Sequence, residues 1–460
     1  MQHGAPDQPS LRDGISFSTI LPGVETPGYY QASFGRVVSQ VCTRRNPLQS
    51  TLPMKTFEQI AELERRYLLG TYNRYPVVLT RGKGVFLYDL DDRRYLDFVS
   101  GLGVNALGHA HPRIVKTIRE QAGKLIHVSN LYYHEYQGAL AEKLCTLAGG
   151  ASGEKFRAFF SNSGTEAIEG SIKLARLAGH RAGGEGKSRL VALEGSYHGR
   201  TFGALSLTGQ EKHRKGFEPM LEDVTFVAQN DVEGLRAAVN ENTCAIVLEP
   251  IFGEGGIYEC SVEFLRECRA LADRFKVALI FDEIQCGLGR TGTMFAFQSF
   301  GVTPDIVAIA KPIAAGLPLG AFIAKEEFAS AISPGQHGTT FGGGPLACRV
   351  ALEFLAIVED EKLLENVNKV GAYLQQELRA VAEKSAAAKE VRGRGFIQGI
   401  NLEIPARPIV DAALAEGVLF NSTQDTVVRF LPPFLLEEKH VDKGIRVLKK
   451  LLRKKRTVAA

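Results

Sequence analysis

Several features that would identify other protein classes are missing from this 460-residue chain. No apolar run approaches the roughly 20 residues that a membrane span needs. The N-terminus lacks a basic region followed by a long apolar one, so we do not expect secretion. The seven cysteines are scattered, with neither a CxxC pair nor the spacing of a zinc site. We therefore expect reduced thiols, a cytoplasmic location and no metal site.

Strong charge and a P-loop motif are also absent. A formal net charge of +4 is too small to indicate nucleic-acid binding, although it slightly favours small anions. GxxxxGK[ST] does not occur, which argues against a P-loop nucleotide site. What is present is ordinary for a globular enzyme: 45% hydrophobic residues, 23% charged residues and 48 glycines.

The chain divides by composition into a loose start and a long globular part. Residues 1–53 are rich in Gly, Pro, Ser and Gln without periodicity, and we interpret them as an extension, or as a leader upstream of an initiator at Met54. Helical spacing of Phe57, Ile60, Leu63 and Tyr67 follows. We expect 54–115 to form the first part of a small lobe, 116–345 a large domain, and 346–460 a C-terminal small domain.

Alternation of short apolar runs with helical stretches predicts the fold. The runs are Phe156–Phe160, Leu190–Leu193, Ala245–Leu248, Val277–Phe281 and Ile306–Ala310. This pattern is typical of a doubly wound α/β domain with a largely parallel sheet. Both chain ends mix helices and short strands, which indicates a smaller α+β lobe. Ligands of such sheets collect at the carboxyl ends of the strands, so the residues that follow each run are informative.

One lysine closes an apolar strand and is the natural centre of a site. Lys311 follows Ile306–Ala310 and precedes a Pro- and Gly-rich segment. Lysine is almost never buried unless it is paired or reacts. In an apolar pocket its pKa falls, and the amine can then form a Schiff base with a carbonyl.

Two other strand ends supply groups that suit such chemistry. Ser163 and Glu166 form a capping-box pattern, so the amides of Gly164 and Thr165 lie at a helix N-terminus that suits a phosphate. Asp282 and Gln285 follow another strand. A buried aspartate that faces a heteroaromatic nitrogen would keep it protonated. Phosphate cradle, amine and carboxylate together indicate pyridoxal phosphate.

Further strand ends carry candidate substrate contacts. Tyr197 suits stacking on a ring, and Arg200 offers a planar fork to a carboxylate, whereas a structural role is at least as good an interpretation for His198. Arg429 lies within an apolar strand and needs an anionic partner, which we take to be a substrate carboxylate, or Glu254 when substrate is absent. Thr339 and Thr340 place two hydroxyls among glycines.

In the order and spacing of these motifs the chain, from about Met54 to its end, resembles the fold-type I, class-III pyridoxal-phosphate aminotransferases. The motifs are Ser163-Gly164-Thr165-Glu166-Ala167, Tyr197-His198-Gly199-Arg200-Thr201, Asp282-Glu283-Ile284-Gln285 and Lys311. Within the class, stretches such as Thr208-Gly209-Gln210-Glu211-Lys212 are most similar to the enzymes that act on acetylornithine. The resemblance implies transfer of the terminal amine of N2-acetyl-L-ornithine to 2-oxoglutarate, as in arginine biosynthesis.

The resemblance also implies a role for each matching residue. Lys311 binds the cofactor covalently and moves the proton, Asp282 pairs with the pyridine nitrogen, and Gln285 lies near the ring hydroxyl. Ser163, Gly164 and Thr165 hold the phosphate, and Tyr197 stacks on the ring where the family usually has phenylalanine. Arg200 and Thr339 bind the acylated amino acid, and Arg429 binds a carboxylate of 2-oxoglutarate. Thr340 reaches the phosphate from a partner subunit, which also supplies Thr339, so a homodimer is expected.

Departures from the family pattern and rival functions remain. Phe252 stands where the family has glutamine, and Gly344 stands where it has asparagine. Phe252 is expected near the substrate and leaves the substrate's identity open. The alternatives are a class-III ω-aminotransferase for ornithine, 4-aminobutyrate, succinylornithine or succinyldiaminopimelate, an aminomutase, and a non-catalytic cofactor-binding regulator. The last would need a DNA-binding module, and residues 1–53 carry no helix-turn-helix pattern.

Overall fold

The computed structural model describes residues 56–150 and 153–454. The predicted extension at 1–53 lies outside these residues. A boundary between two units falls after Glu62, within helix α2 (Phe57–Tyr67), and everything below concerns the second unit, from Leu63 onward. In the described part of the chain no helix is both long and apolar enough to cross a membrane.

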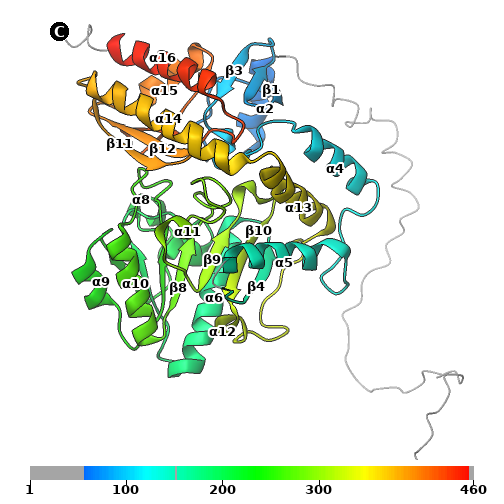
Figure 1. The fold of residues 1–460 in the computed structure, drawn as a ribbon, viewed down its shortest axis with the longest axis vertical. Helices are drawn as coiled ribbons and strands as arrows, with labels where there is room; N and C mark the ends of the chain where they lie inside the picture. Colours follow the sequence, from blue (N-terminus) through cyan, green and yellow to red (C-terminus); the bar gives the residue numbers. More distant parts are fainter. Residues whose placement is uncertain (1–55, 151–152, 455–460) are drawn as a thin grey trace, which may run out of the picture. The chain divides into compact units, whose positions relative to one another are not determined.

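A seven-stranded sheet forms the centre of the larger lobe, in the order β4-β10-β9-β8-β7-β5-β6 (Figure 1). Its strands are β4 (Phe156–Ser161), β5 (Arg189–Leu193), β6 (Val224–Val227), β7 (Thr243–Leu248), β8 (Ala278–Asp282), β9 (Ile306–Ile309) and β10 (Gly320–Lys325). Neighbouring strands are parallel except at β10, which pairs antiparallel with both β4 and β9. The predicted doubly wound, mostly parallel sheet is confirmed.

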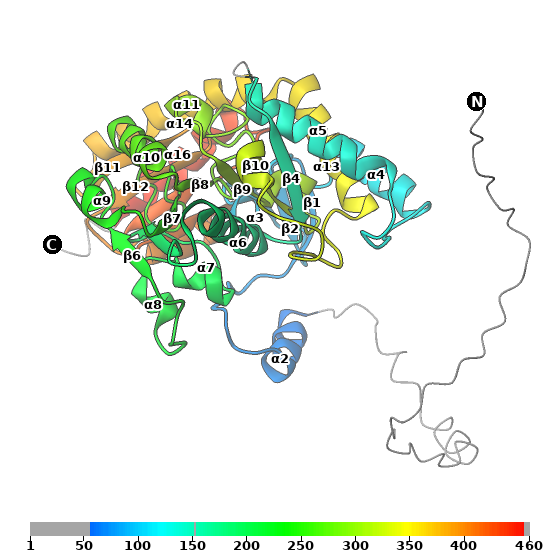
Figure 2. The same cartoon turned by 90° about the horizontal axis from the view of Figure 1, so that it is seen from below.

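Helices cover both faces of this sheet, as Figure 2 shows from below, with α6 on one side and α5 and α10 on the other. Alternate residues of each strand explain the arrangement. Ile280 and Ala308 pack with Ile168 and Ile172 of α6 (Gly164–Gly183), whereas the intervening strand residues join the core that includes α5 (Glu135–Gly149) and α10 (Val262–Phe275). A parallel strand buried on both faces is apolar throughout, which is why these runs were recognisable.

Two four-stranded sheets lie outside the central one. The first joins β1 (Leu79–Lys83), β2 (Phe86–Asp89) and β3 (Arg94–Asp97) to β13 (Val418–Leu419), and β3 and β13 pair in parallel. Sequence-distant ends of the globular part therefore share one sheet. The second contains β11 (Ala388–Arg394), β12 (Ile397–Leu402), β14 (Asn421–Thr423) and β15 (Val427–Phe430).

The remaining elements connect or cover these sheets. Helices in the described residues before and within the large lobe are α3 (Ser100–Gly103), α4 (Pro112–Ala122), α7 (Phe202–Ser206), α8 (Glu211–Arg214), α9 (Val232–Ala238), α11 (Phe297–Phe300), the 3-10 helix η3 (Lys311–Ala314) and α12 (Glu326–Ala329). Those that follow are α13 (Pro345–Asp360), α14 (Leu363–Glu383), α15 (Arg407–Ala415) and α16 (Glu438–Lys454). Helix α16 is rich in basic residues and buries Leu448, Leu451 and Leu452.

Two strands of the central sheet were missing from the sequence prediction. β6 is a four-residue edge strand with a partly exposed pattern, and β10 directly follows the Gly- and Pro-rich segment after Lys311. The partners of β10 lie far away in the sequence.

Candidate active site

Residues from the carboxyl ends of five central strands line one cavity of about 440 Å³. Lining groups follow β4, β5, β7, β8 and β9, and the α6 N-terminus lies at its edge. Every predicted cofactor residue except Thr340 is there: Ser163, Gly164, Thr165, Tyr197, Asp282, Gln285 and Lys311. Arg200 and Glu254 of the predicted substrate set also line it. The volume is within the usual range of small-molecule sites, about 300–1,000 Å³.

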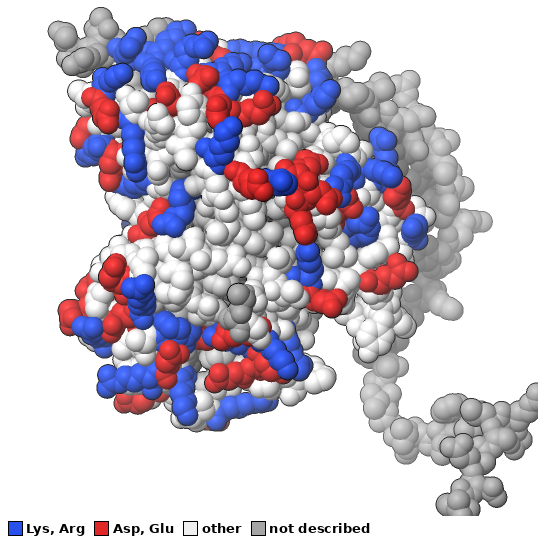
Figure 3. All heavy atoms as spheres, in the orientation of Figure 1, with Lys and Arg blue, Asp and Glu red and all other residues white. Residues whose placement is uncertain are grey.

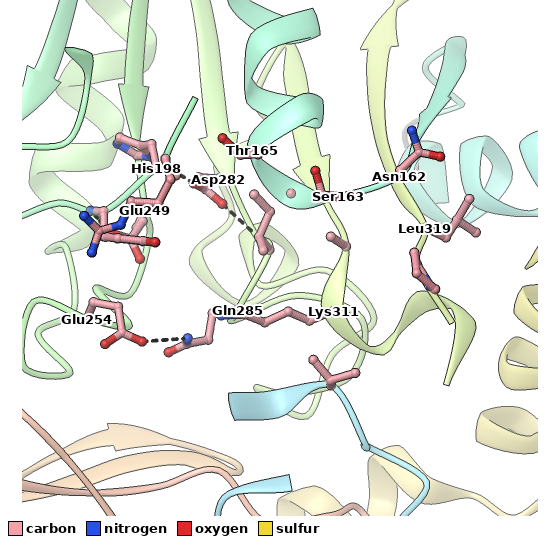
Figure 4. Close-up of a pocket in the computed structure, with 18 of the residues that line it drawn as sticks. Asn162, Ser163, Thr165, His198, Glu249, Glu254, Asp282, Gln285, Lys311 and Leu319 are labelled. Carbon is pink, nitrogen blue, oxygen red and sulfur yellow. Dashed lines mark hydrogen bonds and ion pairs between the residues drawn. The ribbon is translucent and has the colours of Figure 1, made fainter. Parts of the chain in front are cut away.

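Lys311 is held by an unusual local backbone. β9 ends at Ile309, and Lys311 begins η3 with a φ of +30°, a left-handed value that is costly for a residue with a side chain. Its side chain extends into the cavity toward Gln285 (Figure 4). Burial lowers the pKa of Lys311 to about 8, with Glu254 opposing this shift and Arg429 adding to it. A larger fraction of the amine is therefore unprotonated near neutral pH than in an ordinary lysine.

Asp282 is fixed by a buried histidine. Its Oδ2 lies 2.8 Å from Nδ1 of His198, and its Oδ1 accepts the N–H of Ile284 at 3.0 Å. Both side chains are buried, with exposed fractions of 4% for Asp282 and 2% for His198. His198 comes from the loop after β5, and its Nε2 is buried without a hydrogen-bond partner. The contacts with His198 and Ile284 therefore fix the orientation of the Asp282 carboxylate at the end of β8.

The sequence interpretation of His198 as structural missed this contact. The signal was available, because His198 and Asp282 both follow strands whose carboxyl ends meet at one edge of the sheet. Sequence alone did not show that these two side chains touch, because β5 and β8 are not neighbours in the sheet and β7 lies between them.

The N-terminus of α6 presents its free amides to the cavity. Ser163 caps the helix by accepting the N–H of Glu166 at 3.4 Å. Glu166 does not complete the predicted capping box; its Oε2 accepts the N–H of Asn162 at 2.6 Å instead of that of Ser163. A Cβ on Gly164 would lie 2.7 Å from the Ile284 side chain, so only glycine fits here. The exposed amides and helix dipole suit a phosphate group.

Next to the cavity, in contact with its lining residues Glu254 and Gln285, Arg429 is surrounded by acceptors. Its Nη1 lies 2.6 Å from Oε1 of Glu254 and donates to the carbonyl of Gly253 at 2.8 Å. Nε and Nη2 both donate to Oδ1 of Asn421, at 3.0 and 2.5 Å. Only 1% of Arg429 is exposed, so the pair with Glu254 compensates its desolvation in this structure.

Tyr197 and Arg200 lie together in the loop after β5. The guanidinium carbon of Arg200 is 5.7 Å from the centre of the Tyr197 ring, and His213 contacts that ring edge-on at 5.6 Å. Tyr197 is half-buried, whereas Arg200 is exposed. Arg200 is therefore free to meet a ligand at the mouth of the cavity.

Some residues singled out from sequence do not line the cavity beside Lys311, namely Arg429, Thr339, Thr340, Phe252 and Gly344. Thr339 is half-buried and lies 3.3 Å from Asn162, which does line it, and Thr340 is exposed. Phe252 belongs to the buried core and is 2% exposed, with its ring beside Gly195 and Gly255. Its replacement of glutamine therefore changes a packed core position.

Glu249, at the end of β7, is a cavity residue that the sequence analysis did not select. Its Oε1 accepts the N–H of Tyr197, and its Oε2 accepts the N–H of Gly253, each at 2.9 Å. Burial and the neighbouring Asp282 raise the pKa of Glu249 to about 7. The only available signal was its position directly after an apolar strand. Among the described residues no group of acidic, histidine and cysteine side chains could hold a metal ion.

This sheet and this strand-end cavity define a class of protein. The family model for class-III aminotransferases matches residues 70–452, and the chain belongs to that family. The predicted fold class and the resemblance stated from the motifs are confirmed.

Particular relatives refine this placement. The acetylornithine aminotransferase of Methanocaldococcus jannaschii is 45% identical over 391 residues, which cover 85% of this chain and 97% of that one. A crystal structure of the ornithine aminotransferase of Toxoplasma gondii ME49 is 29% identical, with a TM-score of 0.84, and covers 90% of this chain and 100% of the other. The acetylornithine aminotransferase structure from Elizabethkingia anophelis is 31% identical, with a TM-score of 0.77, and covers 87% and 100%.

The residues present fit the cofactor that this family implies. An amine of lowered pKa, an oriented carboxylate and a helix N-terminus open onto the same cavity. The helix N-terminus suits the phosphate of the cofactor, the carboxylate suits its ring nitrogen, and the amine suits its aldehyde. Gly199, with a φ of +137°, lets the loop after β5 approach Thr165, because a Cβ there would lie 2.2 Å from its Oγ1.

Proposed function

We propose that this chain is a pyridoxal-phosphate-dependent aminotransferase that moves the terminal amine of N2-acetyl-L-ornithine to 2-oxoglutarate, giving N-acetylglutamate 5-semialdehyde and glutamate. The acetylornithine aminotransferases among its relatives support the donor. The observation that carries the proposal is the position of the Lys311 amine in the same cavity as the Asp282–His198 pair.

When bound, pyridoxal phosphate supplies an electrophilic carbon and a ring that accepts an electron pair. Asp282, oriented by His198, holds a proton at the ring nitrogen. The amides of Gly164 and Thr165, with Ser163, would bind the phosphate, and Tyr197 would pack against the ring. Gln285 would serve the ring hydroxyl. Lys311 Nζ moves a proton from the substrate carbon next to the transferred nitrogen.

Two arginines orient the substrates. Arg200 and Thr339 bind the carboxylate end of the acylated donor, and Arg429 binds a carboxylate of 2-oxoglutarate. Glu254 pairs with Arg429 before 2-oxoglutarate enters and must release it for binding. By binding the carboxylates, the two arginines hold the reacting carbon over the ring in one orientation. This lowers the entropic cost of reaching the transition state.

The described surface supports the homodimer as part of the proposal. Segments 126–133 and 339–343 contact each other: Asn130 donates to the carbonyls of Thr339 and Gly342 at 3.2 and 3.1 Å. They carry strongly exposed apolar side chains, namely Ile126, Leu131, Tyr132, Tyr133 and Phe341. Figure 3 shows charged side chains concentrated in the upper and lower parts of one face, with a largely uncharged region between them. We place Thr339 and Thr340 against the partner's cavity.

A complementation experiment tests the shared site. Mixed dimers of Lys311→Ala and Thr340→Ala chains should regain activity that neither variant has alone, because one of their two sites is intact. A purely monomeric enzyme by ultracentrifugation, or no regain after mixing, would contradict the dimer. The domain boundaries at 54, 116 and 346 stay predictions. So does the cytoplasmic location, which the free thiols of the six described cysteines favour.

An absorbance titration tests the function itself. Enzyme loaded with pyridoxal phosphate should have a band near the visible edge that acetylornithine removes and 2-oxoglutarate restores, with one glutamate formed per cycle. Ornithine, 4-aminobutyrate and succinylated amines should react more slowly in a parallel panel. Faster reaction of ornithine would assign the chain to the alternative donor, and product without glutamate would indicate an aminomutase. Absence of any band would contradict the proposal.

A further inference from the structure

One buried carboxylate joins two segments that lie against the substrate-binding arginines: the loop that carries Arg200, and the Gly253 segment, which contacts Arg429 of β15. Glu249 lies at the end of β7, and 5% of it is exposed. Its two oxygens accept backbone N–H groups that belong to different segments, Tyr197 and Gly253, each at 2.9 Å. A carboxylate with both oxygens engaged in this way fixes the separation of the two loops.

Each of the two residues whose N–H group binds Glu249 also contacts an arginine. On the first side, the ring of Tyr197 lies under the guanidinium of Arg200 at 5.7 Å. On the second, the carbonyl of Gly253 accepts the Nη1 of Arg429 at 2.8 Å. Gly253 also packs against Gln285, because a Cβ at Gly253 would lie 2.1 Å from Oε1 of Gln285.

We propose that Glu249 is a positioning residue that sets the locations of Arg200 and Arg429 together, by holding the Tyr197 and Gly253 peptides on one carboxylate. The inference rests on the proposed function for the identity of the substrates. It assigns Glu249 no contact with the reacting atoms. Its predicted effect is on the binding of dicarboxylates and acylated amino acids, which the two arginines orient.

The same geometry makes binding sensitive to pH. An ionised Glu249 offers acceptors to both loops, whereas a protonated one offers one acceptor and turns an O–H toward the other N–H. Groups that act electrostatically on Glu249, or on which it acts, are Asp282, His198, Lys311, Cys260 and Cys286. Desolvation and Asp282 raise the pKa of Glu249 to about 7, and His198 opposes them. Affinity for a dicarboxylate should therefore weaken as the pH falls through about 7.

A matched control is available in the next strand. Glu283 is also a buried carboxylate, with 1% exposed, that accepts two backbone N–H groups, those of Ala296 and Phe297 at 2.6 and 2.7 Å. Burial raises its pKa to about 8. It does not line the cavity, and its two backbone partners belong neither to the Tyr197 loop nor to the Gly253 segment. Glu283→Gln therefore replaces a similarly buried carboxylate that accepts two backbone N–H groups but does not hold the Tyr197 and Gly253 peptides together.

The experiment compares Glu249→Gln, Glu283→Gln and the unchanged enzyme, loaded with pyridoxal phosphate. Calorimetric titration with glutarate, which is a dicarboxylate that has no oxo group to react, measures binding without turnover. Glu249→Gln should weaken glutarate binding about 10-fold or more, the size expected for loss of a hydrogen bond to a charged group. KM should rise for both substrates by a similar factor, while kcat changes about 3-fold or less.

Three results would overturn the inference. They are unchanged glutarate binding in Glu249→Gln, an equal weakening in Glu283→Gln, and an effect on kcat without one on KM. If Glu249→Gln does not fold, the pH dependence of glutarate binding by the unchanged enzyme decides: weakening below about pH 7 supports the inference, and a flat profile from pH 6 to 8 contradicts it. Failure of the unchanged enzyme to form glutamate would instead contradict the proposed function.

Discussion

The two ends of the cavity are built differently. At the cofactor end, Asp282, His198 and the α6 N-terminus are held by buried contacts on strands and on a long helix. At the substrate end, Arg200 is exposed on a loop, and Arg429 is engaged by Glu254. In the proposed function the cofactor end is therefore prearranged, whereas the substrate end exchanges the Glu254 carboxylate for a substrate carboxylate. Mutations at the two ends should therefore affect different kinetic constants.

The largest effect is expected at the centre of the cofactor end. Lys311→Ala removes both the covalent attachment point and the group that moves the proton, so kcat should fall at least about 10⁴-fold. Stopped-flow absorbance measures the half-reactions. Lys325→Ala, a half-buried lysine that pairs with Asp305 and Glu154 outside the cavity, is the control and should retain activity. Activity of Lys311→Ala within tenfold of the unchanged enzyme would contradict this assignment.

Asp282 is expected to rank second. Asp282→Ala removes the charge that stabilises the ring nitrogen's proton, and kcat should fall about 10²–10³-fold, the usual cost of a lost electrostatic contact in a water-excluded site. His198→Gln should cause a smaller loss, because it only releases the orientation of Asp282. Steady-state kinetics with both variants measure the order. A larger loss of kcat in His198→Gln than in Asp282→Ala would contradict the assignment of His198 as the residue that only orients Asp282.

A mutation at the substrate end should change KM more than kcat. Arg429→Ala leaves the carboxylate of 2-oxoglutarate without its buried partner, so its KM should rise about 30-fold or more. The half-reaction of acetylornithine should change less, and comparison of the two half-reactions measures this. Equal losses in both would contradict separate sites for the two substrates.

Glu254→Gln should have the smallest effect among the variants. Arg429 would no longer be neutralised before 2-oxoglutarate arrives, so the KM for 2-oxoglutarate should fall a few-fold, by an amount typical of a partly exposed ion pair. Glu259→Gln, which removes the partner of Arg394 elsewhere, is the matched control. A rise in that KM would show that Glu254 does not compete with the substrate.

The pH dependence sharpens the same comparison without mutation. Because burial lowers the pKa of Lys311 to about 8, its amine becomes nucleophilic as the pH rises through 8, well below the value for a free lysine. The rate of pyridoxal phosphate attachment to the cofactor-free enzyme should rise with pH and level off above about 8. A rate that still rises tenfold per unit between pH 9 and 10 would contradict the lowered pKa.

The sequence predicted the cofactor end better than the substrate end, for a physical reason. Strands buried on both faces are apolar throughout, so Asp282 and Lys311 stand out where such runs end. Arg429 was recognisable for the same reason, as a charge within an apolar strand. The contacts of Glu249 were not predictable, because its partners are backbone amides, that of nearby Gly253 and that of Tyr197 in a distant loop, and an amide carries no signature in the sequence. β10 was missed since its antiparallel pairing depends on two strands far away.

The account depends most directly on which lysine binds the cofactor. Enzyme loaded with pyridoxal phosphate, reduced with borohydride and digested, should yield one modified peptide that carries the label on Lys311. A label on any other lysine, with Lys311 unmodified, would contradict the account.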